Sequence, residues 1–144
     1  MPREYPQYPI LAVSATIFNL NHAVLLIQRA KPPAKDQWAL PGGAVQLGES
    51  PEDALTREVL EECRIQVSPT HLHCVSSHIF RDKRQEIQYH YIILNYLCNL
   101  LSGNVQTGSD ATAYQWVSLS DMIHLDLAEG VFETVQEGIK RKGD

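Results

Sequence analysis

Runs of apolar and β-branched residues divide this chain into several predicted strands. Ile10 to Phe18 and Val24 to Gln28 are two such runs, and each predicts a strand. The turn-forming stretch Asn19-Leu20-Asn21-His22 separates them, which predicts a hairpin. The polar run 81–86 is expected to form the loop of a second hairpin. Further strands are expected over residues 72–80, 87–97 and 113–117.

Two segments have the spacing and the end signals of helices. The first spans Ser50 to about Cys63, because Ser50 suits an N-cap and Pro51 suits the first helical position. The second runs from about Ala128 to Lys140. Its apolar stripe consists of Ala128, Phe132, Val135 and Ile139. Helices that interleave with strands and hairpins predict an α+β or an α/β/α layered domain.

Length and charge then exclude some classes of protein. The chain has 144 residues, which predicts a single domain over residues 1–144. It carries 17 acidic and 12 basic side chains, a formal net charge of −5. This sign argues against a nucleic-acid partner. No apolar stretch approaches the ~20 residues that span a bilayer, so we expect no membrane partner either.

The cysteines and histidines show no metal or redox motif. Cys63, Cys74 and Cys98 are odd in number and far apart, which suits free thiols in a reducing compartment. The first residues lack the apolar core of a secretory signal, so we expect a cytoplasmic protein. Three histidines, at 71, 73 and 78, are close in sequence, but without metal-binding spacing we interpret them as ordinary strand and loop residues.

The first predicted helix carries an unusual group of acids. On a helical wheel Glu58, Glu61 and Glu62 fall within an arc of roughly 100° beside an apolar face. Like charges at this spacing repel one another and weaken the helix. A solvated acidic face is one interpretation, although such faces usually mix acids with lysines. Clustered carboxylates without cations fit a hard divalent ion such as Mg²⁺ better.

The same segment accounts for the net charge of the chain. Between Glu49 and Glu62 lie six acids and one base, Arg57, a formal charge of −5. The remaining residues therefore hold eleven acids and eleven bases, which cancel. On formal charges the protein is a neutral scaffold with one acidic site.

The residues around this helix match a specific signature. Gly43 is followed by five residues and Glu49, then by seven residues and the run Arg57-Glu58-Val59-Leu60-Glu61-Glu62-Cys63-Arg64-Ile65. This pattern resembles the box of the Nudix hydrolase family, G-x5-E-x7-R-E-U-x-E-E-x-G-U, where U is a bulky apolar residue. Every charged position of the box is present at the right spacing. The resemblance implies a Nudix-type α/β/α sandwich with a mixed central β-sheet.

The resemblance also implies roles for the residues of the box. Family members use Mg²⁺ or Mn²⁺ to cleave a nucleoside diphosphate linked to another moiety. The divalent ions neutralise the pyrophosphate and lower the pKa of an attacking water. The implied metal ligands are Glu58, Glu61 and Glu62, with Glu49 in a supporting position. Arg57 matches the arginine that orients the glutamates, and Gly42 and Gly43 match the loop that shapes the substrate site.

The family pattern constrains the roles of residues outside the box less closely. Asp110 is our candidate for the general base or an extra metal ligand, with Glu86 as the second choice. An ordinary turn residue is an equally good interpretation of Asp110. We expect Arg29 and Arg81 to contact phosphate or ribose, with solvated loop positions as the alternative. Aromatic candidates for stacking on a base, although side chains at such positions are more often packing residues, are Trp38, Phe80, Tyr89 and Tyr91.

One position departs from the family pattern. Arg64 stands where the box has a glycine. That glycine would adopt the left-handed conformation that ends the helix, and another residue there costs on the order of 1 kcal/mol. The departure removes no carboxylate. We therefore expect it to affect stability or loop placement more than metal binding.

Several stretches outside the box resemble the ADP-ribose pyrophosphatase-like branch of the family. They are Pro9 to Ala15, His90 to Ile92 and Asp110 to Val117. The implied reaction converts ADP-ribose and water to AMP and ribose 5-phosphate. Relatives in this branch are often dimers, so we expect a homodimer.

Other functions on the same fold remain open. A housecleaning enzyme for oxidised or non-standard nucleoside triphosphates would use the same box and release pyrophosphate. A non-catalytic ligand sensor would commonly lack box glutamates, which this chain keeps. Removal of RNA caps is disfavoured by the absence of a basic tract.

Overall fold

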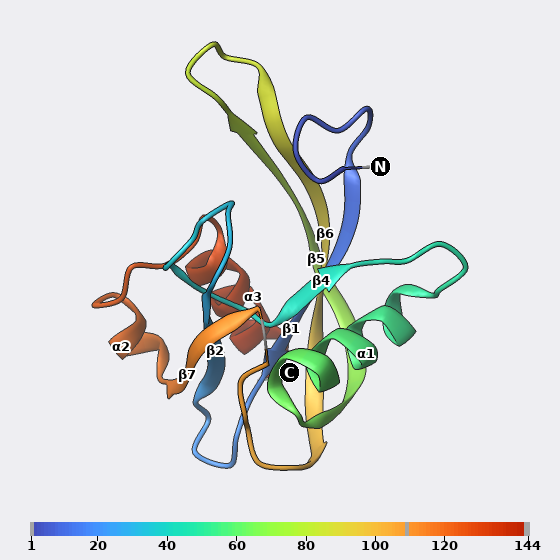
Figure 1. Ribbon diagram of the computed structural model, residues 1–144. Coiled ribbons are helices and arrows are strands. Elements are labelled where there is room, and N and C mark those ends of the chain that lie inside the picture. Colours follow the sequence, from blue (N-terminus) through green and yellow to red (C-terminus); the bar gives the residue numbers. More distant parts are fainter. Residues whose placement is uncertain (1, 109, 143–144) are drawn as a thin grey trace.

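A computed structural model describes residues 2–108 and 110–142 of the chain, which form strands and helices in layers (Figure 1). The strands are β1 (Ile10–Ile17), β2 (Val24–Arg29), β3 (Trp38–Ala39), β4 (Gly42–Ala44), β5 (Gln66–Arg81), β6 (Ile87–Ser102) and β7 (Ala111–Val117). The helices are α1 (Pro51–Cys63), α2 (Leu119–Met122) and α3 (Val131–Lys142). None of the described helices is both long and apolar enough to cross a membrane.

The strands form two sheets. The first is mixed, in the order β4-β1-β6-β5, with β1 parallel to β6 and antiparallel to β4. The second is antiparallel, in the order β3-β2-β7. The predicted mixed sheet is therefore confirmed, and a smaller sheet that the sequence analysis did not anticipate lies beside it.

The predicted hairpin of the first two strands is wrong. β1 and β2 belong to different sheets and share only an isolated bridge between Phe18 and Val24. β1 pairs instead with β6, from Ile10 opposite Tyr91 to Ile17 opposite Cys98. The turn between the two strands is present, but contacts distant in sequence decide the pairing.

Helices cover both sides of the sheets (Figure 1). The first core packs α1 against β1 and β6, with Leu55, Val59 and Ile17 fully buried. The second core packs α3 and α2 against β2 and β7. β2 serves both cores because its side chains alternate: Leu25 and Ile27 face the first core, and Leu26 faces the second. The expected α/β/α sandwich is thus confirmed.

Local signals place both ends of α1. The Ser50 side chain accepts a hydrogen bond from the backbone N–H of Asp53 at 3.1 Å, which confirms the predicted N-cap. Arg64 ends the helix in the left-handed conformation, with φ 61° and ψ 27°. Its backbone N–H donates to the carbonyl of Leu60 at 3.0 Å. The arginine therefore keeps the backbone conformation for which the family uses glycine.

Three other predicted boundaries need correction. Helix α3 begins at Val131, after Gly130 with φ +82°, so Ala128 precedes the helix. The stripe residues Phe132, Val135 and Ile139 do pack in the second core. β5 begins six residues before the predicted Leu72, and β6 continues to Ser102. These two strands form a long hairpin that projects from the body of the molecule, and the polar run 81–86 forms its loop as predicted (Figure 1).

Candidate active site

A cavity of about 320 Å³ opens beside the glycines that precede α1. Its lining comes from β1, β4, β5 and β6, from α1, and from the segment that enters α3. Glu58 and Glu62 of α1 line it, as do Arg29, Lys31 and Asp110. Apolar walls include Val13, Ile93 and Val131. The fold thus gathers acidic, basic and apolar groups from distant parts of the sequence around one space.

Arg57 holds three of the box glutamates together. Its guanidinium donates to both carboxylate oxygens of Glu49, from Nε at 2.7 Å and from Nη2 at 2.9 Å. Nη1 donates to Glu58 at 2.9 Å and to Glu61 at 3.3 Å. These hydrogen bonds lower the pKa of Glu49 to about 2 and raise that of Arg57. Because a bidentate pair fixes a guanidinium in direction as well as position, Arg57 orients the other carboxylates.

Glu62 is the most buried carboxylate of the helix. It is 9% exposed, and burial raises its pKa to about 7, with the neighbouring Glu58 charge adding to the rise. One oxygen accepts a hydrogen bond from the backbone N–H of Gly42 at 3.2 Å. Burial also raises the pKa of Glu58, although Arg57 opposes this. Two desolvated carboxylates therefore face the cavity and repel each other.

The paired glycines allow α1 to approach the sheet. A Cβ on Gly42 would overlap the backbone of Val13 and Ser14, and a Cβ on Gly43 would overlap the carboxylate of Glu58. Both positions need a hydrogen atom instead of a side chain, because backbone or carboxylate atoms already occupy that space. Gly42 therefore allows close packing within the sheet, and Gly43 leaves room for the carboxylate of Glu58.

The segment after β6 brings Asp110 to the cavity. It packs on the end of α1, where the N–H of Gln106 donates to Cys63 and the N–H of Gly108 donates to Glu62. These bonds satisfy helix carbonyls that have no partner within the helix. The Asp110 side chain is 55% exposed and lies 3.3 Å from the ammonium of Lys31. The predicted base candidate therefore reaches the cavity that Glu58 and Glu62 line.

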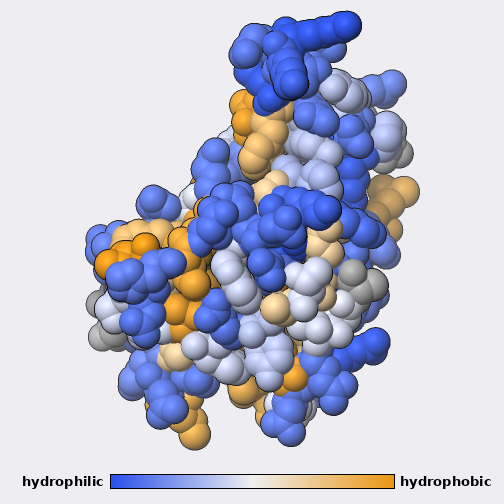
Figure 2. Space-filling view, turned by 60° about the vertical axis from the view of Figure 1, so that its left-hand side comes forward, coloured by the Kyte–Doolittle hydropathy of each residue, from blue (hydrophilic) through white to orange (hydrophobic). Residues whose placement is uncertain are grey.

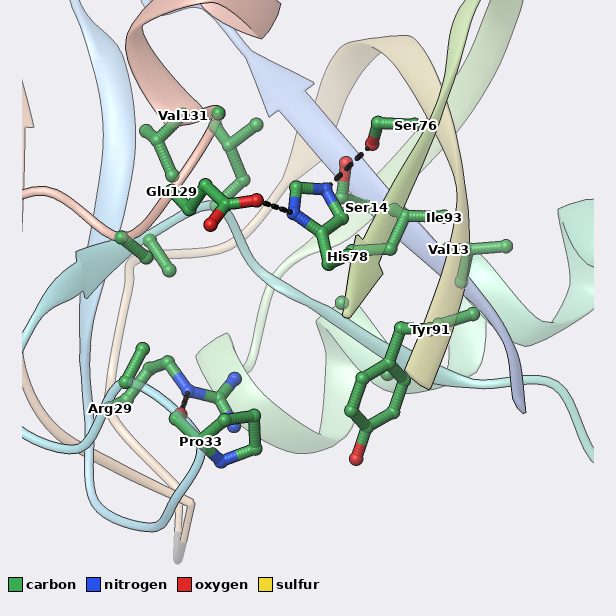
Figure 3. A pocket seen from close by; sticks show the side chains of 18 of the residues that line it. Val13, Ser14, Arg29, Pro33, Ser76, His78, Tyr91, Ile93, Glu129 and Val131 are labelled. Atoms are coloured by element: carbon green, nitrogen blue, oxygen red, sulfur yellow. Dashed lines mark hydrogen bonds and ion pairs between the residues drawn. The ribbon is translucent and has the colours of Figure 1, made fainter. Parts of the chain in front are cut away.

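A polar group at another part of the cavity includes His78, which the sequence predicted to be an ordinary strand or loop residue. The His78 ring lies between Glu129 and Ser76, with Nδ1 at 3.3 Å from the former and Nε2 at 2.9 Å from the latter (Figure 3). Asn95 donates to the Ser76 hydroxyl at 3.1 Å and accepts from that of Ser14. A signal was present: polar residues occupy alternate positions, 76 and 78, of a strand that the sequence analysis treated as apolar.

Some candidates lie away from this cavity. Arg81 donates to the carbonyl of Gln85 at 3.0 Å, within the loop of the long hairpin. Glu86 lies in the same loop, and its backbone N–H donates to Asp82. Glu61 is 62% exposed and reaches only Arg57 among the described residues, whereas Glu49 supports that arginine from outside the lining. The structure therefore joins Glu58, Glu62 and Asp110 but separates them from Arg81.

The aromatic candidates also divide into two groups. Phe80 and Tyr91 line the cavity, where either ring can meet a ligand. Tyr89 is 7% exposed and packs edge-on against Phe80, with ring centroids 6.3 Å apart. Trp38 packs against the second core. Arg29 lines the cavity, and its Nε donates to the carbonyl of Pro33 at 2.7 Å (Figure 3).

The donor set at Glu58 and Glu62 fits a hard divalent cation. Carboxylate oxygens are the ligands that Mg²⁺ prefers, and a cation relieves the repulsion between two desolvated carboxylates. Among the described residues, no three acid, histidine or cysteine side chains gather as a closed metal cage. Mg²⁺ at phosphate-binding sites usually takes one or two carboxylates and completes its shell with water and substrate oxygens, so a cage is not required.

Comparisons with known proteins agree with this site. A family profile described as the NUDIX domain matches residues 9–137. An ADP-ribose pyrophosphatase of Methanocaldococcus jannaschii is 32% identical over 115 residues, which cover 80% of this chain and 65% of that protein. A nucleoside triphosphatase of Escherichia coli, NudI, is 31% identical over 106 residues, which cover 69% of this chain and 74% of that protein.

The fold is also found among solved structures. A MutT protein from Methanosarcina mazei superposes with a TM-score of 0.79, covering 96% of this chain and 99% of that one. The two sequences are 22% identical. At this identity the likeness concerns the fold.

Proposed function

This chain belongs to the Nudix hydrolase family, and on that premise we propose that it hydrolyses the pyrophosphate bond of a nucleoside diphosphate linked to another moiety, with Mg²⁺ or Mn²⁺. The proposed substrate is ADP-ribose, which water splits into AMP and ribose 5-phosphate. The observation that carries the proposal is the pair of carboxylates formed by the buried Glu62 and the half-buried Glu58, which faces a cavity also lined by Arg29 and Lys31.

We propose that Glu58 and Glu62 hold the divalent ion. A bound ion would neutralise the pyrophosphate and lower the pKa of the attacking water. Arg57 keeps Glu58 in place through their 2.9 Å hydrogen bond, and Glu49 fixes the arginine in turn. Glu61, the third expected ligand, is exposed and its carboxylate lies at the same guanidinium. The arginine thus acts as a positioning residue for the carboxylates of the box.

Basic and acidic groups at the rim of the cavity suit the phosphates of the substrate and the attacking water, respectively. Arg29 and Lys31 supply positive charge for the phosphates, which the carboxylates alone would repel. Asp110 is the proposed general base. Its side chain is 55% exposed, so water can reach it, and the Lys31 ammonium lies 3.3 Å away. In that role Asp110 accepts the proton of the water that attacks phosphorus, and the bridging oxygen leaves with the other phosphate.

The choice of ADP-ribose rests on the similarity and on the shape of the cavity. A cavity of about 320 Å³ with apolar and aromatic walls is of the size that holds a small ligand. The relative from M. jannaschii is named an ADP-ribose pyrophosphatase. This chain spans 65% of the length of that relative, so its substrate is a proposal for the present chain.

A second candidate function is the hydrolysis of nucleoside triphosphates. The E. coli relative at 31% identity carries the name of a nucleoside triphosphatase. The same carboxylates would serve, but the product would be pyrophosphate instead of two monophosphates. Product analysis therefore separates the two functions.

The test is a screen of the purified chain with Mg²⁺ against ADP-ribose, dinucleoside polyphosphates, NADH and nucleoside triphosphates. We expect AMP and ribose 5-phosphate from ADP-ribose, and we expect Glu62→Gln and Glu58→Gln to lower kcat/KM about 100- to 1000-fold, on the order of what removing a key electrostatic group costs. Glu133→Gln is the matched control, because this glutamate is exposed on α3. Full activity in Glu62→Gln would refute the assignment of the metal ligands.

The proposal also covers the cellular compartment and the oligomeric state. We propose a cytoplasmic enzyme, supported by the free state of Cys63, Cys74 and Cys98. Its partner is a nucleotide-type small molecule, and we also propose that it acts as a homodimer. Measurement of the cysteine redox state in cells and of the mass in solution tests these two points.

A further inference from the structure

Three lysine or arginine side chains line the cavity, and they differ in how they are paired. They are Arg3, Arg29 and Lys31. Arg29 donates from Nε to the carbonyl of Pro33, and the ammonium of Lys31 lies 3.3 Å from the carboxylate of Asp110. Among the described residues, the guanidinium of Arg3 has neither a hydrogen-bond acceptor nor an ion-pair partner. All five of its N–H donors are therefore free to meet a ligand.

The segment that carries Arg3 is tied to the long hairpin. This segment, residues 2–9, precedes β1, and we call it the strap. Figure 1 shows it beside the projecting hairpin of β5 and β6. The backbone N–H of Tyr5 donates to the carbonyl of Gln88 at 2.8 Å, and the Tyr5 hydroxyl donates to Asp82 at 2.8 Å. Two hydrogen bonds from one residue therefore anchor the strap.

The hairpin loop holds this anchor in turn. The second carboxylate oxygen of Asp82 accepts hydrogen bonds from the backbone N–H groups of Arg84 at 2.8 Å and Glu86 at 3.0 Å. Tyr5 adopts φ 50°, a left-handed conformation that side chains disfavour, and such a conformation persists only where its surroundings hold it. The strap is therefore fixed two positions after Arg3 in the chain.

Arg3 and Arg29 approach different carboxylates from different sheets. Burial raises the pKa of Glu58, and the positive charges of Arg57 and Arg3 oppose the rise. Burial also raises the pKa of Glu62, where Arg29 is the arginine whose charge opposes the rise. The strap of Arg3 lies on the hairpin of the first sheet, whereas Arg29 ends β2 of the second sheet. One guanidinium is thus near each member of the carboxylate pair.

We propose that Arg3 binds one of the two phosphates of a nucleoside diphosphate in this cavity, and that Tyr5 is a positioning residue that holds Arg3 there. The inference rests on the proposed function, in which a pyrophosphate meets Glu58 and Glu62. On formal charges, two carboxylates and two phosphates carry four negative charges and one divalent ion supplies two positive ones, so two guanidiniums balance the remainder. A guanidinium also offers phosphate oxygens two parallel N–H donors. Arg29 and Arg3 then supply one guanidinium for each phosphate.

Neutralisation of Glu58 alone is the competing interpretation of Arg3. A positive charge beside a carboxylate disfavours a second cation there. Under this interpretation, the loss of Arg3 would strengthen Mg²⁺ binding and leave diphosphate binding unchanged. If Arg3 binds phosphate, its loss weakens diphosphate binding. The two interpretations therefore differ in which ligand responds to the variant.

Isothermal titration calorimetry with α,β-methylene-ADP and excess Mg²⁺ tests the proposal. In this nucleoside diphosphate a CH₂ group replaces the bridging oxygen, so it is not hydrolysed. Arg3→Ala should raise its Kd about 10-fold or more, and Arg3→Lys should recover only part of the loss because it keeps the charge without the fork. Tyr5→Phe, which loses the bond to Asp82, should raise the Kd about threefold. Adding Tyr5→Phe to Arg3→Ala should change nothing further, since Tyr5 acts through Arg3.

A matched control and a Mg²⁺ titration complete the experiment. Arg84→Ala removes the same side chain from the exposed hairpin loop and should leave the Kd of the probe unchanged. Arg3 is itself exposed, so we expect its variants to fold. An unchanged Kd in Arg3→Ala would overturn the proposal, and tighter Mg²⁺ binding by that variant without the probe would assign Arg3 to Glu58 alone. Further weakening on adding Tyr5→Phe to Arg3→Ala would overturn the positioning role of Tyr5.

The proposed reaction is judged separately, by the substrate screen. A wild-type chain that does not bind the probe would overturn the role of Arg3, whatever the screen shows. A chain that binds the probe through Arg3 but hydrolyses no compound of the screen would refute the reaction and keep the phosphate contact. A chain that hydrolyses ADP-ribose equally well with and without Arg3 would keep the reaction and refute the contact.

Discussion

Helix α1 and the β5–β6 hairpin differ sharply in their content of charged side chains. The segment from Glu49 to Glu62 holds six acids and one base, whereas residues 66–80 and 87–102 hold no charged side chain. In the helix, Arg57 and the glutamates constrain one another through hydrogen bonds of 2.7 to 3.3 Å. In the hairpin, backbone pairing joins two strands of 16 residues each, and side chains of both strands, such as Val67 and Tyr96, pack in the first core.

The difference shows what each region requires from outside the chain. Buried carboxylates such as Glu62 are destabilised by desolvation, and a cation relieves that cost. An uncharged edge is destabilised by exposed backbone groups and apolar side chains, and another strand relieves that cost. The carboxylates of the helix are therefore suited to a cationic ligand, and the outer edge of β5, with which no described strand pairs, is suited to another strand.

Among variants that leave every carboxylate in place, removal of the single base of the charged region is expected to have the largest effect. Arg57→Ala leaves Glu49, Glu58 and Glu61 without their common partner, so we expect kcat/KM to fall about 100- to 1000-fold. Arg57→Lys keeps the charge but loses the fork geometry, and should recover only part of the activity. Arg84→Ala, at the exposed hairpin loop, is the matched control and should change kcat/KM less than twofold. A loss below about 10-fold in Arg57→Ala would contradict the positioning role.

The two glycines of the site should respond to the same substitution in different ways. In Gly42→Ala the new Cβ meets the backbone of Val13, which cannot move without the sheet, so we expect destabilisation by about 3 kcal/mol. In Gly43→Ala it meets the mobile end of the Glu58 side chain. That variant should keep its stability and lose activity about 10-fold or more. Urea denaturation and kinetics on both variants check this, and equal stability losses would contradict it.

The buried Glu62 predicts how stability depends on pH in the absence of metal. Its pKa rises from 4.5 to about 7 on folding, so the folded chain binds the proton more tightly than the unfolded chain does. The stabilisation is complete below pH 4.5 and is lost as pH rises through 7. With EDTA present, we expect the free energy of unfolding to fall by on the order of 2 to 3 kcal/mol between pH 5 and 7.5.

A variant and a metal titration isolate the source of that pH dependence. Glu62→Gln should flatten the profile, because the amide carries no charge at either pH. Mg²⁺ should stabilise the wild-type chain more at pH 7.5 than at pH 5, since it competes with protons for the same oxygens. An unchanged slope in Glu62→Gln would show that other groups cause it.

Local signals explain which parts of the site could be predicted from sequence. The N-cap at Ser50, the left-handed exit at Arg64 and the acids on one helix face depend on residues a few positions apart. The predicted bounds of α1 are therefore confirmed, and two of its three clustered carboxylates, Glu58 and Glu62, line the cavity, whereas Glu61 is exposed. Asp110 was also predicted, and the structure brings it to the cavity through backbone bonds to the end of α1.

Contacts between distant segments explain what sequence could not predict. His78 and Glu129 are 51 residues apart, and neither belongs to a motif. The separation of β1 and β2 depends on the pairing of β1 with β6. β6 begins at Ile87, seventy residues after β1 ends at Ile17. β5 extends back to Gln66 across Pro69 and several polar residues. The sequence there lacks the apolar–polar alternation of a strand, but pairing with β6 makes it one.

The smallest expected effect concerns the exit of α1 and asks whether the charged region depends on its helix end. Arg64 adopts φ 61°, which a side chain disfavours and glycine does not. Arg64→Gly should therefore stabilise the fold by about 0.5 to 1 kcal/mol, reduced by the greater freedom of glycine in the unfolded chain. Because no carboxylate changes, kcat/KM should stay within twofold. Thermal unfolding and kinetics measure both, and Arg64→Ala, which keeps a Cβ, should gain no stability. A loss of activity in Arg64→Gly would mean that the arginine itself takes part in the site.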